Sequence, residues 1–114
     1  MEVKSQLKYV RISPLKVRLV GDLIRGLSAT EAQKQLRFCS KKAADSLLKL
    51  LNSAIANAEH NFQIAKDNLY IKELRVDQGP TFKRQLPRAR GRADLIRKRT
   101  SHVTLVLEQR KEQS

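Results

Sequence analysis

A strongly basic stretch in the C-terminal third of the chain is the clearest candidate for binding chemistry. Residues 79–99 contain eight cations and a single acid, Asp94. The cations are Lys83, Arg84, Arg88, Arg90, Arg92, Arg97, Lys98 and Arg99. Most of them are arginines, whose planar guanidinium groups bind phosphate oxygens through two hydrogen bonds and also stack on bases. The pattern therefore indicates binding to the phosphates of a nucleic acid.

The charge of the whole chain agrees with this interpretation. Its 114 residues include 24 Lys and Arg against 11 Asp and Glu, a net charge of +13 at pH 7. Such an excess repels itself in a compact fold, which indicates a polyanionic partner. There is no apolar run long enough to span a bilayer, no secretory signal and no basic helix with an aromatic membrane anchor. A nucleic acid is therefore favoured over a membrane.

Three strands are predicted from alternating apolar and polar residues, over residues 3–12, 69–76 and 102–107. In the second strand the alternation changes phase, which predicts a bulge or burial on both faces. The charged tail from Glu108 is expected to fray. The apolar residues on one face of the first strand are Val3, Leu7 and Tyr9.

Three helices are predicted between the first and second strands. The first begins at Ser13–Pro14 and ends at Gly26, a typical C-terminal glycine. Ser28 and Glu31 form a capping box for the second helix, and Ser40 is expected to cap the longer third helix. The predicted apolar positions are Leu15, Leu19, Val20, Leu23 and Ile24 in the first helix, Ala32, Leu36 and Phe38 in the second, and Ala44, Leu47, Leu48, Leu51, Ala54, Ile55 and Ala58 in the third.

This order of elements predicts one α+β domain over residues 1–114, a small, largely antiparallel three-stranded sheet packed against three helices. The basic stretch lies between two strands, so it is expected to form a long extended basic β-hairpin at about residues 78–101. Ten residues on each side, at about 3.3 Å each, would project roughly 30 Å. Such a hairpin is marginal alone, and phosphates would stabilise it. A solvated, disordered loop is the alternative.

A second basic feature lies on the first helix. Arg18 and Arg25 are seven residues apart and share a face, and Arg11 precedes the helix. That face is predicted to lie away from the apolar stripe, where it either contacts RNA phosphate or is simply solvated. Lys41, Lys42 and Lys49 are weaker candidates, because Asp45 lies four residues from both Lys41 and Lys49 and such local helix pairs account for much of the pattern.

Residues for catalysis are scarce. The chain has two histidines and one cysteine, Cys39, which excludes an internal disulfide or a Cys-rich metal site. No Gly-rich phosphate loop occurs. We therefore expect no enzyme activity, no cofactor and no small-molecule substrate. Two alternatives stay open: a metal nuclease built on Asp67, Glu73 and Asp77, and an architectural DNA-binding protein with basic β-arms.

Several long motifs follow one another in a characteristic order between about Leu7 and Leu107. They read Arg11-Ile12-Ser13-Pro14, Lys16-Val17-Arg18, Asn52-Ser53-Ala54-Ile55-Ala56-Asn57-Ala58-Glu59-His60-Asn61, Asp77-Gln78-Gly79-Pro80-Thr81-Phe82-Lys83-Arg84, Pro87-Arg88-Ala89-Arg90-Gly91-Arg92-Ala93-Asp94 and Ile96-Arg97-Lys98-Arg99-Thr100-Ser101-His102-Val103. Together they resemble the large-subunit ribosomal protein twenty-two family, in its bacterial or organellar form.

The resemblance implies a structural constituent of the large ribosomal subunit that binds and organises its RNA during assembly, in the cytoplasm or an organelle. In that family the hairpin lines the nascent-peptide exit tunnel, and the globular domain lies near the tunnel exit. The partners it implies are large-subunit ribosomal RNA, neighbouring ribosomal proteins, the nascent polypeptide, and targeting factors or chaperones at the exit.

Site residues follow from the resemblance position by position. It implies RNA contacts by Ser13, Lys16 and Arg18 from the domain, and by Lys83, Arg84, Arg97, Lys98 and Arg99 along the hairpin stem. The hairpin tip would consist of Arg88, Ala89, Arg90, Gly91 and Arg92. Leu15 departs from the family, which often has a polar or basic residue there, and it is expected to extend the apolar stripe.

Overall fold

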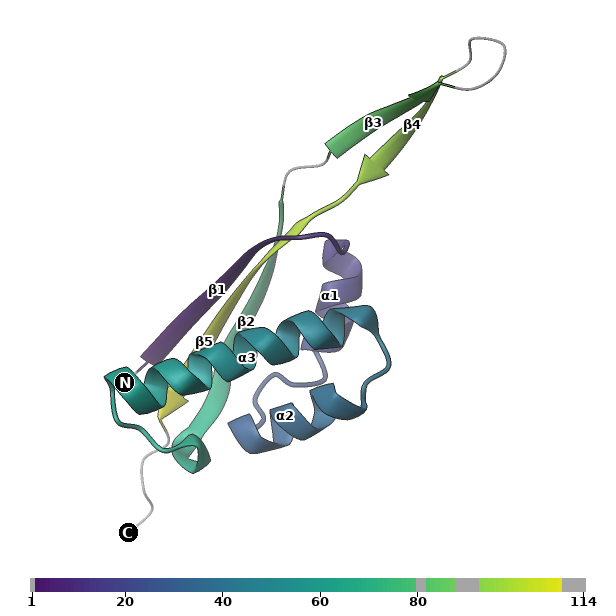
Figure 1. The fold of residues 1–114 in the computed structure, drawn as a ribbon. Helices are drawn as coiled ribbons and strands as arrows, with labels where there is room; N and C mark the ends of the chain where they lie inside the picture. Colours follow the sequence, from purple (N-terminus) through teal and green to yellow (C-terminus); the bar gives the residue numbers. More distant parts are fainter. Residues whose placement is uncertain (1, 80–81, 88–92, 110–114) are drawn as a thin grey trace.

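Three helices cover one face of a three-stranded antiparallel sheet, and a two-stranded hairpin projects from one end of it (Figure 1). This computed structural model describes residues 2–79, 82–87 and 93–109, with side chains placed in residues 2–79 and 99–109. The elements are β1 (Glu2–Val10), α1 (Pro14–Gly21), α2 (Ala29–Phe38), α3 (Lys42–Asn61), the 3-10 turn η1 (Lys66–Asn68), β2 (Leu69–Gln78), β3 (Phe82–Pro87), β4 (Ala93–Lys98) and β5 (Ser101–Gln109). The predicted α+β class is confirmed.

Strand β5 is the centre of the sheet and pairs antiparallel with β1 on one side and β2 on the other. Val103, for example, is aligned with Leu7 and with Val76. The central residues of β5 are buried on both faces. The strand continues to Gln109, so the chain does not fray at Glu108 as predicted, and residues 110–114 of the predicted tail lie outside the described residues.

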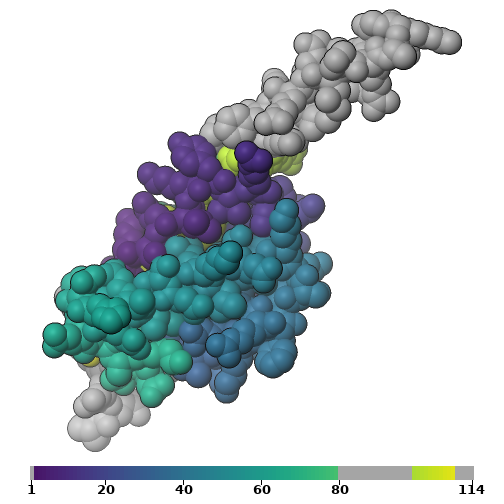
Figure 2. All heavy atoms as spheres, viewed as in Figure 1, coloured from purple at the N-terminus to yellow at the C-terminus, as the bar shows by residue number. Residues whose placement is uncertain are grey.

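Helix α3 supplies much of the core and contacts β1, β5, α1 and α2. Figure 2 shows α2 and α3, in blue and teal, forming the near face of the domain. The predicted apolar stripe is confirmed except at Leu48, which is half-buried at its edge. Its least exposed residues, at 2% or below, are Ala44, Leu47, Leu51, Ala54 and Ala58. The small alanines let the helix backbone lie close to its neighbours.

The buried face of α1 agrees with the predicted stripe only in part, because Val20 and Ile24 are buried as predicted and the three leucines are not. The predicted stripe residues Leu15, Leu19 and Leu23 are 66%, 58% and 52% exposed. The buried positions are Pro14, Val17, Val20, Gly21 and Ile24. A Cβ on Gly21 would lie 2.5 Å from a side-chain carbon of β2, so this glycine sets the face by close approach. The helix ends at Gly21, so the predicted end at Gly26 was wrong; Gly26, with a φ of 79°, instead ends the turns that follow.

The capping predictions hold at one helix and fail at another. Ser28 Oγ accepts a hydrogen bond from the Glu31 backbone N–H at 3.2 Å, so the predicted start of α2 is confirmed. Ser40 does not cap α3, because the N-cap position is Lys41 and no side chain caps this helix.

Phe38, predicted on the apolar face of α2, is 89% exposed.

Bulges interrupt both outer strands of the sheet. In β2 the register shifts between Ile71 and Glu73, as predicted. In β1 the register shifts between Leu7 and Val10, and Tyr9 has a φ of 61°. This bulge leaves Tyr9 59% exposed, so the prediction that it continues the apolar face was wrong.

Two arginines cover the outer edge of β2. Arg18 donates from Nε and Nη2 to the Val76 carbonyl oxygen at 3.3 and 2.9 Å. Arg25 donates from the same two atoms to the Leu74 carbonyl oxygen at 3.1 and 2.8 Å. These bonds satisfy carbonyl groups of an edge strand that would otherwise be open to pairing with another chain.

The root of the hairpin is tightly packed. The Gly79 N–H donates to the Thr100 carbonyl at 2.9 Å, and Ser101 Oγ donates to the Ile12 carbonyl at 2.6 Å. Thr100 and Ser101 are 1% and 0% exposed. A Cβ on Gly79 would lie 2.4 Å from Thr100 Oγ1. The root therefore ties the hairpin to the segment between β1 and α1.

Arg25→Lys should destabilise the domain by about 1 kcal/mol, because lysine keeps the charge but loses the paired hydrogen bonds to the Leu74 carbonyl. The free energy of unfolding from urea denaturation measures the loss. Arg37→Lys, at an exposed arginine on α2, is the matched control and should change stability by less than about 0.5 kcal/mol. Equal losses in the two variants would contradict a role for Arg25 at the sheet edge.

Gly79→Ala should cost about 1–3 kcal/mol, because the added methyl group overpacks the buried Thr100 hydroxyl. Thermal and urea unfolding report the loss, and the exposed neighbour Gln78→Ala serves as the control. If the Gly79→Ala chain is as stable as its parent, the residues around Thr100 can shift to accommodate the methyl group, and the prediction of overpacking is wrong.

Candidate nucleic-acid interface

The basic hairpin forms as predicted, with β3 and β4 paired antiparallel. The backbone register aligns Lys83 with Arg97, and Lys98 with Phe82. Two cations aligned directly across a strand pair disfavour the hairpin by themselves. Arg84 also lies in β3, aligned with Ile96. The predicted tip residues lie outside the described residues: Arg88, Ala89, Arg90, Gly91 and Arg92.

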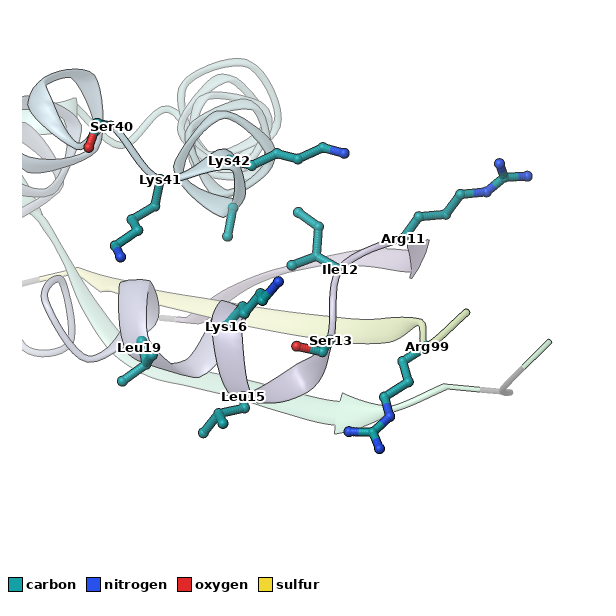
Figure 3. Close-up of a pocket in the computed structure, with 11 residues that line it drawn as sticks. Arg11, Ile12, Ser13, Leu15, Lys16, Leu19, Ser40, Lys41, Lys42 and Arg99 are labelled. Atoms are coloured by element: carbon teal, nitrogen blue, oxygen red, sulfur yellow. The ribbon is translucent and has the colours of Figure 1, made fainter. Parts of the chain in front are cut away.

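A groove of about 1020 Å³ lies at the foot of the hairpin, between the starts of α1 and α3 (Figure 3). Five cations line it, and no carboxylate is among the described residues of its wall. The lining residues are Arg11, Ile12, Ser13, Leu15, Lys16, Leu19, Ser40, Lys41, Lys42, Ala43 and Arg99. We call this site the α1–α3 groove. In Figure 3 Lys41 and Lys42 stand on one wall, Lys16 on the other, and Arg11 and Arg99 at the end near the hairpin.

Both helices that border the groove begin there without a side-chain cap. Ser13 occupies the N-cap position of α1, as predicted, but its hydroxyl makes no capping hydrogen bond. Lys41 is the N-cap of α3 and offers no acceptor at all. The first N–H groups of a helix need acceptors, and its dipole places partial positive charge at this end. The helix starts therefore add to the attraction that the five cations exert on an anion.

Sequence reasoning missed Lys41 and Lys42, because it explained much of the lysine pattern here by local helix pairs with Asp45. The described ion pairs do not include that aspartate. A usable signal was present, because lysines at a helix N-terminus oppose the helix dipole and carboxylates are preferred there. Two adjacent lysines at the start of a long helix therefore indicate an anionic partner.

The other predicted domain contacts fall into two groups. Arg11, Ser13 and Lys16 come together in the α1–α3 groove, where they are joined by Arg99, which was predicted as part of the hairpin stem. Arg18 and Arg25 do not line it, and their guanidinium groups are bonded to carbonyl groups of β2. Their shared face was predicted to be free for phosphate or solvent, whereas part of it packs on the sheet edge.

The sheet face away from the helices has a balanced charge. Lys72 donates to Glu2 and lies 3.7 Å from Glu108. The hydrogen bond with Glu2 and the charge of Glu108 raise the pKa of Lys72. The Tyr70 hydroxyl donates to Glu108 at 2.6 Å and lowers the pKa of that carboxyl group. Because lysine and carboxylates neutralise one another here, this face is a weaker candidate for binding an anion than the groove.

An aromatic pair lies between β1 and β5, beside the root of the hairpin. The Tyr9 N–H donates to His102 Nδ1 at 3.1 Å, and the two rings meet edge to face with centroids 4.8 Å apart. His102 therefore holds the bulge in β1.

No group of three or more metal-ligating side chains occurs within the described parts of the chain, so Asp67, Glu73 and Asp77 do not form the nuclease site considered above. None of the described helices is long and apolar enough to cross a membrane.

Residues 5–108 match the family model described as Ribosomal protein L22p/L17e. A relative from Pelotomaculum thermopropionicum is 54% identical over 112 residues, which cover 98% of this chain and 99% of the relative. Relatives from Thermus thermophilus and Chloroflexus aggregans are 57% and 55% identical over 107 residues, covering 94% of this chain and 95% of each relative. All three are named large ribosomal subunit protein uL22. The match extends over nearly the whole chain and confirms the resemblance, so the protein belongs to the Ribosomal protein L22p/L17e family.

Proposed function

We propose that this protein is a structural constituent of the large ribosomal subunit, where it binds and organises ribosomal RNA. The observation that carries the proposal is the α1–α3 groove, in which five cations and two helix starts meet at the foot of a basic hairpin, with no carboxylate among the described lining residues. The names of the relatives support the same subunit. The role is positional, so no reacting group is needed.

The finer part of the proposal concerns the hairpin. It would thread between RNA segments and line the nascent-peptide exit tunnel, while the helical domain lies near the tunnel exit. Two paired strands are narrow, only about 5 Å from backbone to backbone, and they carry side chains on both faces. Such a rod can enter a crowded RNA interior that a helix pair could not. Arg88, Ala89, Arg90, Gly91 and Arg92 are the residues that we propose for the tunnel wall.

The proposed mechanism is neutralisation of phosphate repulsion where RNA segments converge. The backbone register aligns Lys83 with Arg97, and like charges at directly facing positions disfavour strand pairing, so a bound phosphate would favour the hairpin. Each cation that reaches a phosphate releases a condensed counterion, and this release drives association. RNA packing and hairpin order would then stabilise each other during subunit assembly.

Partners follow from this location on the ribosome. The main partner is large-subunit ribosomal RNA, and neighbouring ribosomal proteins would border the domain. A nascent polypeptide would pass the hairpin tip. Targeting factors and chaperones that act at the tunnel exit are further candidates for the outer surface.

Binding of the full chain to large-subunit ribosomal RNA should weaken steeply as salt increases. If about six hairpin cations contact phosphates, a plot of log affinity against log salt concentration should have a slope on the order of −4 to −5. Filter binding over a salt series measures this slope. A slope near zero would sink the electrostatic mechanism.

Reversing charge in the hairpin stem should weaken incorporation into the subunit. Arg84→Glu with Arg97→Glu would replace two attractive phosphate contacts by repulsive ones, so a tagged chain should leave the large-subunit fraction during a high-salt wash. Lys34→Glu with Lys49→Glu changes the net charge equally at exposed helix positions outside the groove lining. This control chain should remain bound.

Two outcomes of this high-salt wash of the sedimented large-subunit fraction would count against the proposal. Retention of the stem variant at the level of the parent would show that the stem contacts are dispensable. A parent chain that sediments with chromosomal DNA would favour the architectural DNA-binding alternative instead.

A further inference from the structure

We propose that the α1–α3 groove binds a segment of unpaired, single-stranded RNA, with one nucleobase stacked on Phe38 at its rim. The inference rests on the proposed function and deepens it, because it specifies both the form of the RNA and the surface that receives it.

Phe38 is the most exposed large apolar side chain among the described residues, at 89%. It is the last residue of α2 and lies two positions before Ser40, which lines the groove. Two trans peptide units span at most about 7.6 Å between Cα atoms, so the backbone of Phe38 lies close to the groove wall at Ser40, although its side chain is not part of the lining. Lys41 and Lys42 follow immediately. An aromatic ring beside a row of cations is the arrangement that binds single strands, since bases stack on the ring while the cations contact phosphates.

The apolar part of the groove distinguishes unpaired RNA from a duplex. Leu15 and Leu19 lie on its wall and remain 66% and 58% exposed. A duplex presents phosphates and ribose and keeps its bases stacked inside, so it would leave these side chains and Phe38 largely in water. An unpaired nucleotide has an exposed base that can cover them. At about 1020 Å³ the groove also has room for more than a single small group.

The charged part of the groove favours RNA over a protein segment. Lysine is depleted from the cores of protein interfaces, whereas three of the groove residues are lysines: Lys16, Lys41 and Lys42. Two uncapped helix starts require acceptors for their N–H groups, and phosphate oxygens provide several at once. A protein partner would need an acidic segment to match five cations without a carboxylate.

Arg11 and Arg99 extend the charged surface from the groove to the foot of the hairpin (Figure 3). A strand that leaves the groove past these two residues would reach the hairpin stem, where the cations continue. The groove and the hairpin would therefore bind one continuous RNA surface, with the unpaired segment at its domain end.

The test compares the full chain and its variants for binding to two labelled probes, a single-stranded RNA of about ten nucleotides and an RNA duplex of about ten base pairs. Fluorescence anisotropy gives the dissociation constants. The parent should bind the single strand several-fold more tightly than the duplex. Phe38→Ala should weaken single-strand binding about tenfold, as expected for the loss of one stacked base, and leave duplex binding unchanged.

Two variants serve as controls. Phe38→Trp keeps an aromatic face and should retain single-strand binding, whereas Phe62→Ala removes another exposed aromatic ring, beyond the far end of α3, and should have no effect. Equal effects of Phe38→Ala and Phe62→Ala, or equal parental affinity for both probes, would overturn the inference and leave the proposed function standing. A parent that binds neither these probes nor ribosomal RNA would overturn the proposed function itself.

A second readout uses the assembled large subunit. A photoreactive phenylalanine analogue placed at position 38 of the full chain should crosslink to an unpaired nucleotide of ribosomal RNA. A crosslink to a base-paired nucleotide would overturn the single-strand assignment. A crosslink to a protein would assign this face to protein docking and would overturn the inference as well.

Discussion

Like-charge repulsion is the constraint around which this protein is organised. A net charge of +13 disfavours any compact fold, so the position of each acid matters. The acids in described ion pairs lie on the open sheet face and on the outer surfaces of the helices. The pairs are Asp22 with Arg25, Glu31 with Lys34, Glu2 and Glu108 with Lys72, and Glu73 with Arg75. These pairs offset part of the positive charge elsewhere, while five cations and no carboxylate are found among the described residues that line the α1–α3 groove.

Three local features of the chain are energetically unfavourable when no partner is bound, and an anionic partner would compensate for all three. Lys41 and Lys42 oppose the dipole of α3, two helix starts lack side-chain caps, and Lys83 is aligned with Arg97 across the hairpin. Departures from local preference tend to gather at functional sites, because binding compensates for them. Phosphate supplies both the negative charge and the acceptors that these places lack. Their clustering near one end of the sheet is a physical argument for a single extended RNA surface.

The elements that could be predicted from sequence are those whose signal is local. The stripe on α3 repeats over many turns, Ser28 caps α2 through a residue three positions away, and the change of phase in β2 marks its bulge. Which face of α1 is buried could not be predicted from a local signal. Leu15 and Leu19 have helical spacing, but so do the buried residues of the opposite face, and close approach at Gly21 selects the latter.

Features that depend on contacts between distant segments could not be predicted either, because no local sequence signal marks them. The bulge at Tyr9 is held by His102, which lies 93 residues further along the chain. The α1–α3 groove is assembled from three separate stretches of sequence, and only the fold brings Lys41 beside Arg11 and Arg99. Charge counting therefore identified the polyanionic partner and most of the hairpin, but it could not identify the groove.

Arg18 and Arg25 show why a cation on a helix face is an ambiguous signal. Each guanidinium carries five N–H donors, and two from each arginine are bonded to a β2 carbonyl. The β2 edge continues toward β3, so covering it prevents the base of an exposed hairpin from pairing with another strand. Both arginines remain partly exposed, and the donors that are not used for the β2 carbonyls or, at Arg25, for Asp22 can still reach phosphate. Edge protection and RNA contact are thus compatible in one side chain, because arginine offers more donors than either task requires.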